Sequence, residues 1–151
     1  MRRAFAIALV GVGLLSTPAF SSAIRPSDER EIDRLFALCS KLGHKWPHEN
    51  CFNRPEFWRE SKRVADKSGT PIIHAVMRRA RRYPANEQSE GPGFTLLPVV
   101  ALLPRAPAVE LLHHYEQSND KAEQLWAHEY LIEFNMADTA ELVKQYSGSN
   151  H

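Results

Sequence analysis

Histidine and glutamate are the residues of this 151-residue chain that most readily suggest chemistry, since imidazoles and carboxylates bind metals and transfer protons. His44 and His48 stand four residues apart, a spacing that brings two side chains together on a helix. Trp46-Pro47 lies between them and predicts a loop instead. This pair therefore does not form a helical metal chelate.

The histidines of the C-terminal half also lack the spacing of a metal site. His113 and His114 are adjacent, so on a helix they point about 100° apart. His128 and Glu129 resemble the start of an H-E-x-x-H zinc helix, but Ile132 occupies the place of the second histidine. The sequence predicts neither a metal site nor a cofactor.

Three glutamates are the remaining candidates for acid–base chemistry. Glu129 and Glu133 are one helical turn apart and Glu110 lies upstream, whereas glycoside cleavage needs two carboxyl groups about 5 to 10 Å apart. The same spacing is typical of a solvated helix face. No G-x-S-x-G nucleophile motif occurs. We expect no catalytic residues, and a small periplasmic enzyme or metal-binding domain using His and Glu stands as the alternative.

The first 23 residues have the three parts of a secretory signal peptide. Met1-Arg2-Arg3 is basic, Ala4 to Leu15 is apolar, and Ser21-Ser22-Ala23 offers small residues for cleavage. The apolar run is shorter than the roughly 20 residues that span a bilayer. We expect 1–23 to be removed, and 24–151 to be periplasmic or secreted without membrane insertion.

The expected mature part, 24–151, has the length of one domain. Loss of Arg2 and Arg3 changes the formal charge from +1 to −1. A chain with this balanced charge has no net attraction for polyanions, and no recognition module is present. We therefore expect no nucleic-acid partner.

Both cysteines, Cys39 and Cys51, lie in the expected mature part, and disulfides persist outside the cytosol. Only one intramolecular pairing exists, and its short loop would add about 3 kcal/mol of stability. A metal or redox pair is the alternative, but the spacing is not C-x-x-C. A disulfide would also leave no thiol nucleophile.

The elements that must position these residues are all helical, because apolar residues recur at helical spacing and no segment alternates as a strand does. Ser27 and Asn53 read as caps of the first two helices. We expect about seven short helices in one compact all-α domain, over 28–42, 53–69, 71–83, 94–103, 107–118, 119–135 and 138–146. The helix over 119–135 is apolar around most of its circumference, so we expect it to be covered on several sides. Pairs of helices in the C-terminal half resemble HEAT-type hairpins in length.

The helix over 71–83 has one apolar and one basic face. The apolar face contains Ile72, Ile73, Val76, Met77, Ala80 and Tyr83, and the opposite face contains His74 and the arginines of the run Arg78-Arg79-Ala80-Arg81-Arg82. The run is either an exposed helix face or a docking surface for acidic groups, which arginine binds bidentately. Arg78 and Arg82 are the partner-binding candidates here.

Two predicted loops are further candidates for contact with a partner. The loop closed by the two cysteines offers Trp46, His48 and Phe52 for an interface, and the alternative is that Trp46 and Phe52 form a small satellite core under the loop. The segment 84–93 is polar, rich in turn formers and without periodicity, so it is a binding loop or a solvated connector. Its candidate contact residues are Asn86, Glu87, Gln88, Ser89 and Glu90.

A basic signal peptide, an all-α mature domain, a short-loop disulfide between Cys39 and Cys51, and no catalytic motif together resemble the periplasmic immunity proteins that act against type VI secreted peptidoglycan amidases. The resemblance implies a protein that binds a cell-wall hydrolase and blocks its active-site cleft with a loop. The segment 84–93 is our candidate for that loop. A helical scaffold for envelope assembly is another interpretation, and homodimerisation is left open.

Overall fold

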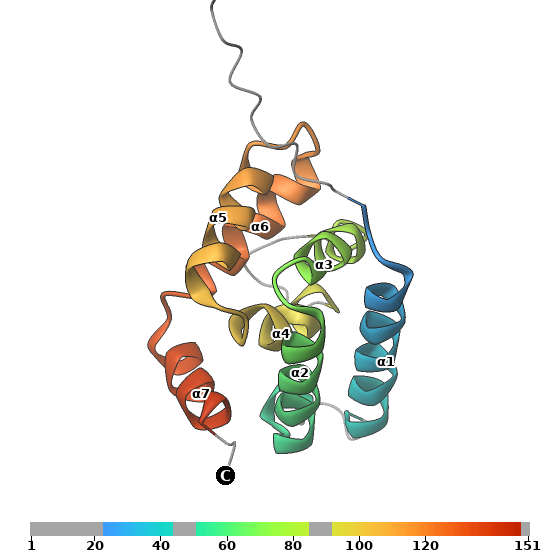
Figure 1. Cartoon of the computed structure of the whole chain (residues 1–151), viewed down its shortest axis with the longest axis vertical. Helices are drawn as coiled ribbons and strands as arrows, with labels where there is room; N and C mark the ends of the chain where they lie inside the picture. The colour runs from blue at the N-terminus through green and yellow to red at the C-terminus, as the bar shows by residue number, and fades with distance from the viewer. Residues whose placement is uncertain (1–22, 44–50, 85–91, 149–151) are drawn as a thin grey trace, which may run out of the picture.

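A computed structural model describes residues 23–43, 51–84 and 92–148. These ranges contain helices and no strand, which confirms the all-α prediction (Figure 1). Residues 1–22 of the expected signal peptide lie outside them. The elements are α1 (Pro26–Leu42), the 3₁₀ helix η1 (Cys51–Asn53), α2 (Pro55–Ser68), α3 (Ile72–Ala80), the 3₁₀ helix η2 (Pro92–Leu96), α4 (Leu97–Ala101), α5 (Arg105–Glu116), α6 (Lys121–Glu133) and α7 (Ala137–Ser147).

Helices α1 and α2 each begin with a proline, which fits the first turn because its missing N–H has no intrahelical acceptor there. The N-cap residues are therefore Arg25 and Arg54, not the predicted Ser27 and Asn53. Both helices end at glycines as expected. Gly69 adopts a positive φ of 64°, which favours glycine, and turns the chain directly into α3.

Helix α3 is largely enclosed, because every residue in it except Arg78 and Arg79 is buried. It lies across the top of α1 and against α6 (Figure 1). The helix ends at Ala80, short of the predicted Tyr83, and a turn follows in which the Tyr83 N–H donates to the Ala80 carbonyl. Pro84 has no N–H with which to continue the helix, and the chain before it tightens into i→i+3 bonds, from Arg82 to Arg79 and from Tyr83 to Ala80.

Helices η2 and α4 form the buried centre of the molecule, behind α2 (Figure 1). Leu96 to Leu103 are all buried, as the apolar run predicted. Around them, Phe57 and Trp58 of α2 and Trp126 and Tyr130 of α6 have at most 1% of their surface exposed. Large aromatic residues thus complete the core from both sides.

Helices α5 and α6 lie side by side as a hairpin (Figure 1). Helix α5 begins at Arg105, two residues before the predicted Pro107. Asp120 caps α6, and its Oδ1 accepts hydrogen bonds from the Ala122 and Glu123 N–H groups at 2.9 and 3.2 Å. Of the two predicted caps for this helix, the aspartate is therefore correct.

Helix α6 is covered on more than one side, as predicted, because α3, α4 and α5 pack against it. Trp126, Ala127 and Tyr130 face the core, but Leu125 and Ile132 remain 38% and 43% exposed. The neighbouring helices therefore leave part of its outer face exposed. The helix lies at the edge of the fold.

Helix α7 returns to the bottom of the molecule and packs on α2 and α4 (Figure 1). The Tyr146 ring stacks on the Trp58 ring with 5.5 Å between centroids. Met136 is the N-cap residue, so Asp138 lies in the first turn rather than capping the helix as predicted. Within the described ranges, every helix is too short or too polar to cross a membrane.

Candidate functional site

The segment predicted as a binding loop is attached to α6 at both of its ends. Before the segment, the Tyr83 carbonyl accepts a hydrogen bond of 2.9 Å from the Trp126 indole N–H. At its last residue, the Gly93 carbonyl accepts a hydrogen bond of 2.7 Å from the Tyr130 hydroxyl. Trp126 and Tyr130 are fully buried and one helical turn apart. One rigid helix therefore fixes where the segment leaves and rejoins the fold.

The second attachment depends on the absence of a side chain at Gly93. A Cβ there would lie 2.2 Å from the Trp126 ring, which no real side chain tolerates. The Phe94 ring also meets the Trp126 ring edge-on, with 5.4 Å between centroids. Burial raises the pKa of the Tyr130 phenol, so its hydroxyl stays protonated and remains a donor. Residues 85–91, including Asn86, Glu87, Gln88, Ser89 and Glu90, lie outside the described residues.

The second predicted loop is pinned at its base. Cys39 and Cys51 form the expected disulfide, with Cα atoms 5.0 Å apart. Beside it, the Trp58 indole N–H donates to the Phe52 carbonyl at 2.8 Å, and the two rings meet edge-on. Residues 44–50 lie outside the described residues, and with them the candidates Trp46 and His48. The chain on both sides of these residues is firmly held.

The arginine run contacts acidic residues of the chain itself. Arg78 forms an ion pair with Glu29 of α1, and Arg79 forms one with Asp33 of the same helix. Arg81 approaches Asp120 and Glu123 of α6 at 3.5 and 3.4 Å. Three of the four arginines thus tie α3 to its neighbours. Of the two partner-binding candidates in this run, Arg78 is engaged in this way, whereas Arg82 is exposed.

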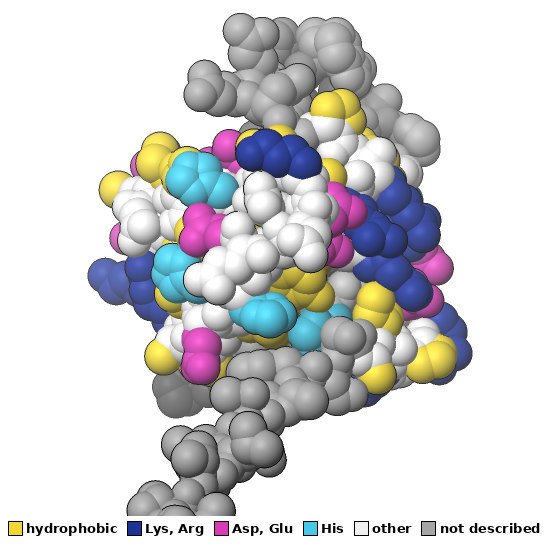
Figure 2. Space-filling model, turned by 90° about the horizontal axis from the view of Figure 1, so that it is seen from above, with side chains coloured by type: hydrophobic (Ala, Val, Ile, Leu, Met, Phe, Trp, Pro, Cys, Tyr) yellow, Lys and Arg dark blue, Asp and Glu magenta, His cyan; other side chains and the backbone are white. Residues whose placement is uncertain are grey.

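The described histidines gather on the face above α3, α5 and α6 (Figure 2). His74 was expected on the polar side of its helix but is buried against α5, where its Nδ1 lies 2.7 Å from the Tyr115 hydroxyl. Burial, and next to it the charge of His114, lower the pKa of His74, although Asp28 acts in the opposite direction. Burial raises the pKa of Tyr115 to about 12. A neutral His74 accepts a hydrogen bond from the Tyr115 hydroxyl at Nδ1 in the tautomer that carries its proton on Nε2.

Glu116 brings two other histidines together at the end of the α5–α6 hairpin. One of its carboxylate oxygens lies 2.8 Å from His113 Nδ1, and the other lies 3.1 Å from His128 Nδ1. The hydrogen bonds from His113 and His128 lower the pKa of Glu116. In the part of the chain that the structure describes, no three His, Cys, Asp or Glu residues are arranged to hold a metal ion.

The three glutamates considered for acid–base chemistry have separate surroundings. Glu133 accepts a hydrogen bond of 3.3 Å from Thr139, which ties it to α7. Glu110 and His113 line an open depression along α5, together with Ala106 and Val109. Glu129 lies on α6, among partly exposed residues. The arrangement of Glu116 with two histidines was not predicted, because its members come from two helices.

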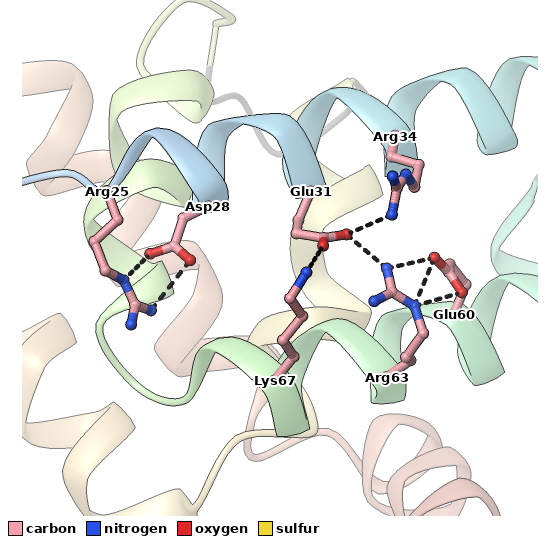
Figure 3. Close-up of polar contacts among 7 residues, drawn as sticks. All are labelled: Arg25, Asp28, Glu31, Arg34, Glu60, Arg63 and Lys67. Carbon is pink, nitrogen blue, oxygen red and sulfur yellow. Dashed lines mark hydrogen bonds and ion pairs between the residues drawn. The ribbon is translucent and has the colours of Figure 1, made fainter.

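Buried charges hold together α1 and α2, the two helices that flank the disulfide (Figure 3). Glu31 of α1 is 3% exposed and accepts hydrogen bonds of 2.6 Å from both Arg63 and Lys67 of α2. Burial by itself would raise the pKa of Glu31, but these bonds outweigh it and lower the pKa from 4.5 to about 2. Hydrogen bonds to Glu60 and Glu31 raise the pKa of Arg63.

Comparison of the chain with family models, with curated proteins and with solved structures found no match.

Proposed function

We propose that this chain is an exported helical binding protein that uses the segment 84–93 to contact a protein partner, and that this partner is a secreted cell-wall hydrolase. The observation that carries the proposal is the attachment of both ends of the segment to α6. Trp126 holds the Tyr83 carbonyl and Tyr130 holds the Gly93 carbonyl. Binding residues are often carried on loops that a rigid scaffold positions.

The physical advantage of this arrangement is a lower entropic cost of binding. A segment whose two ends are already fixed loses less conformational freedom when it meets a partner. Its sequence between the ends is polar, with Glu87 and Glu90 flanking Gln88 and Ser89. Such side chains offer hydrogen-bond acceptors and donors to the polar cleft of an enzyme.

The sequence supports export, and export defines the kind of partner. The pattern of residues 1–23 favours secretion across a bacterial inner membrane. The disulfide between Cys39 and Cys51 suits an oxidising compartment. A protein in that compartment can meet enzymes that act on the cell wall. Blocking such an enzyme would protect the cell that makes the inhibitor.

The test compares two variants of the full-length chain, expressed with its own leader. In the first, Glu87, Gln88, Ser89 and Glu90 are replaced by alanine. In the control, Glu141 and Lys144, both exposed on α7, are replaced by alanine. We expect the first variant to bind the product of the neighbouring gene at least about tenfold more weakly, equivalent to about 1.4 kcal/mol. The control should bind as the parent does.

Both variants should keep the melting temperature of the parent, because the changed side chains are not part of the described core. Equal affinity in the parent and the first variant would place the contact surface elsewhere. A toxicity assay separates binding from protection. Cells that export the hydrolase should survive when the parent chain is present and should lyse when it carries the four alanines.

A further inference from the structure

Two short rows of basic side chains lie next to each other where α1 meets α2. Arg30 and Arg34 are one turn apart on α1, and Arg63 and Lys67 are one turn apart on α2. Figure 3 shows that the last three of these cations approach one buried carboxylate, that of Glu31, so the two rows meet there. We call the surface formed by the four cations the basic seam.

The basic seam carries more positive charge than the fold neutralises. Like charges one helical turn apart repel each other and destabilise a helix, and this spacing occurs in both rows. In the part of the chain that the structure describes, the carboxylates that contact these cations are Glu31 and Glu60. Four cations therefore face two carboxylates, and the seam keeps an excess of positive charge.

The cations of the seam also keep hydrogen-bond donors for a further anion. Glu31 is buried beneath them, whereas Arg34, Arg63 and Lys67 each keep at least 40% of their side chains exposed. Glu31 accepts one hydrogen bond from each of these three, but an arginine has five N–H groups and a lysine has three. Arg30 is exposed, and within the described ranges its side chain has no hydrogen bond or ion pair. Unused N–H groups therefore remain on the solvent side of the seam.

The chemistry of these donors suits a phosphate group. A guanidinium binds two oxygens of a phosphate through parallel hydrogen bonds, and a lysine adds a compact positive charge. A phosphate monoester carries a charge between about −1.5 and −2 at pH 7 and offers three acceptor oxygens, which matches the excess charge of the seam. A carboxylate offers only one charge and two oxygens.

We propose that the basic seam, formed by Arg30, Arg34, Arg63 and Lys67, binds a phosphate group, either as free phosphate or as the monoester head group of an acidic lipid. Glu31 lies beneath this site and holds the cations of α2 beside those of α1. The site is separate from the segment 84–93 and does not depend on a partner bound there.

Isothermal titration calorimetry with inorganic phosphate, at constant ionic strength, tests the site in the full-length chain expressed with its own leader. We expect saturable binding with a dissociation constant on the order of 1 mM. Replacing Arg30 and Arg34 together by glutamine should weaken binding at least about tenfold, and it leaves the two cations of α2 on Glu31. The control replaces Lys121 and Lys144, exposed on α6 and α7, by glutamine and should bind as the parent does.

Thermal melting checks that both variants fold. Titration of the parent without saturation would overturn the proposal, and so would an equal loss of affinity in the seam variant and the control, because a general charge effect would then explain the binding. Backbone amide chemical shifts should change on addition of phosphate along 30–34 and 63–67. Changes confined to other helices would place the anion elsewhere and would overturn the assignment to the seam.

Vesicles distinguish the two sources of phosphate. Vesicles of phosphatidylcholine alone are compared with vesicles that also contain phosphatidic acid, whose head group is a phosphate monoester. Retention of the parent on the second kind, lost in the seam variant, would support the lipid. Binding of inorganic phosphate without retention would support free phosphate. Retention that is the same in the parent and the seam variant would count against the seam.

Discussion

Replacing Glu31 with glutamine keeps the shape of the side chain and removes its negative charge from the junction of α1 and α2. In the folded protein that charge is 3% exposed and receives hydrogen bonds from Arg63 and Lys67 (Figure 3). The substitution leaves both cations without their main acceptor on α1. Arg63 and Lys67 keep 40% and 57% of their side chains exposed, so water can solvate them after the substitution, and what the fold loses is the attraction between a buried carboxylate and these two cations.

The pKa of Glu31 sets the expected magnitude. Its fall from 4.5 to about 2 corresponds to about 3 kcal/mol of folding free energy, at about 1.4 kcal/mol for each tenfold change in acid dissociation. For a domain of this size, we expect a fall of about 10 °C in the melting temperature of Glu31→Gln at neutral pH. Urea unfolding provides the free energy independently.

The pH dependence gives a second, sharper expectation. A carboxylate whose folded pKa is lowered stabilises the fold above its unfolded pKa and loses this effect as the pH falls through the folded value. The contribution of Glu31 is therefore complete above pH 4.5 and decreases as the pH falls toward about 2. The stability difference between the parent and Glu31→Gln should shrink over that interval.

Glu60→Gln is the matched control, since Glu60 binds the same Arg63 but keeps 26% of its side chain exposed. Exposed ion pairs contribute at most about 1 kcal/mol, so this variant should remain close to the parent. If Glu31→Gln loses no more stability than Glu60→Gln, or if its loss is independent of pH, then our reasoning about the buried charge is wrong.

Four further predictions concern the anchors and the histidine face. Gly93→Ala should lower the free energy of unfolding in urea by about 1 to 3 kcal/mol, because the added methyl group meets the Trp126 ring. In the control Gly148→Ala, the added methyl group has its nearest contact at 3.5 Å, and the free energy of unfolding should not change. An unchanged unfolding midpoint in Gly93→Ala would refute the close approach. Tyr130→Phe should lower the free energy of unfolding by about 1 to 3 kcal/mol, because the Gly93 carbonyl loses its hydrogen-bond donor. Equal stability of the variant and the parent would mean that water or another group replaces the hydroxyl. Reduction of the Cys39–Cys51 disulfide should lower the folding stability by about 3 kcal/mol, measured by thermal melting with and without reductant. Two free thiols found by mass spectrometry in the untreated protein would contradict the disulfide. The pKa of His74 is lowered in the folded protein, so below pH 6.5 the unfolded state takes up a proton more readily and the free energy of unfolding decreases. His74→Gln should lose this pH dependence. A free energy of unfolding that does not change with pH around 6.5 in the parent would count against a buried neutral imidazole.

Local signals in the sequence predicted the helices well. Proline and glycine marked the limits of α1 and α2, and apolar periodicity identified the α-helices that the structure contains. The errors at the starts of α1 and α2 have one cause. Ser27 and Asn53 are good capping residues, but a proline nearby fixes the first turn and moves the cap to an arginine.

The sequence could not show which faces of the helices are covered. In α6 apolar residues surround most of the helix, so periodicity does not distinguish the buried Trp126 from the exposed Ile132. In α3 the pattern placed His74 with the arginines, whereas Tyr115 of α5 covers it. Burial of these residues depends on neighbours that are distant in the chain.

The candidate site has the same division between local and distant information. Composition singled out the segment 84–93 but could not reveal its attachments. The carbonyls of Tyr83 and Gly93 are held by residues 43 and 37 positions away. The acidic partners of the arginine run are equally remote, because Glu29 and Asp33 lie on α1. Only the fold brings these groups together.

A pull-down from periplasmic extract tests the central claim most directly. The tagged full-length chain, expressed with its own leader, is mixed with the product of the neighbouring gene. The peptidoglycan hydrolysis by that gene product is measured in the same fractions. We expect a stable complex in which hydrolysis is blocked, and recovery of hydrolysis when Glu87, Gln88, Ser89 and Glu90 are replaced by alanine. Absence of a complex, together with undiminished hydrolysis in the presence of the parent chain, would contradict the account.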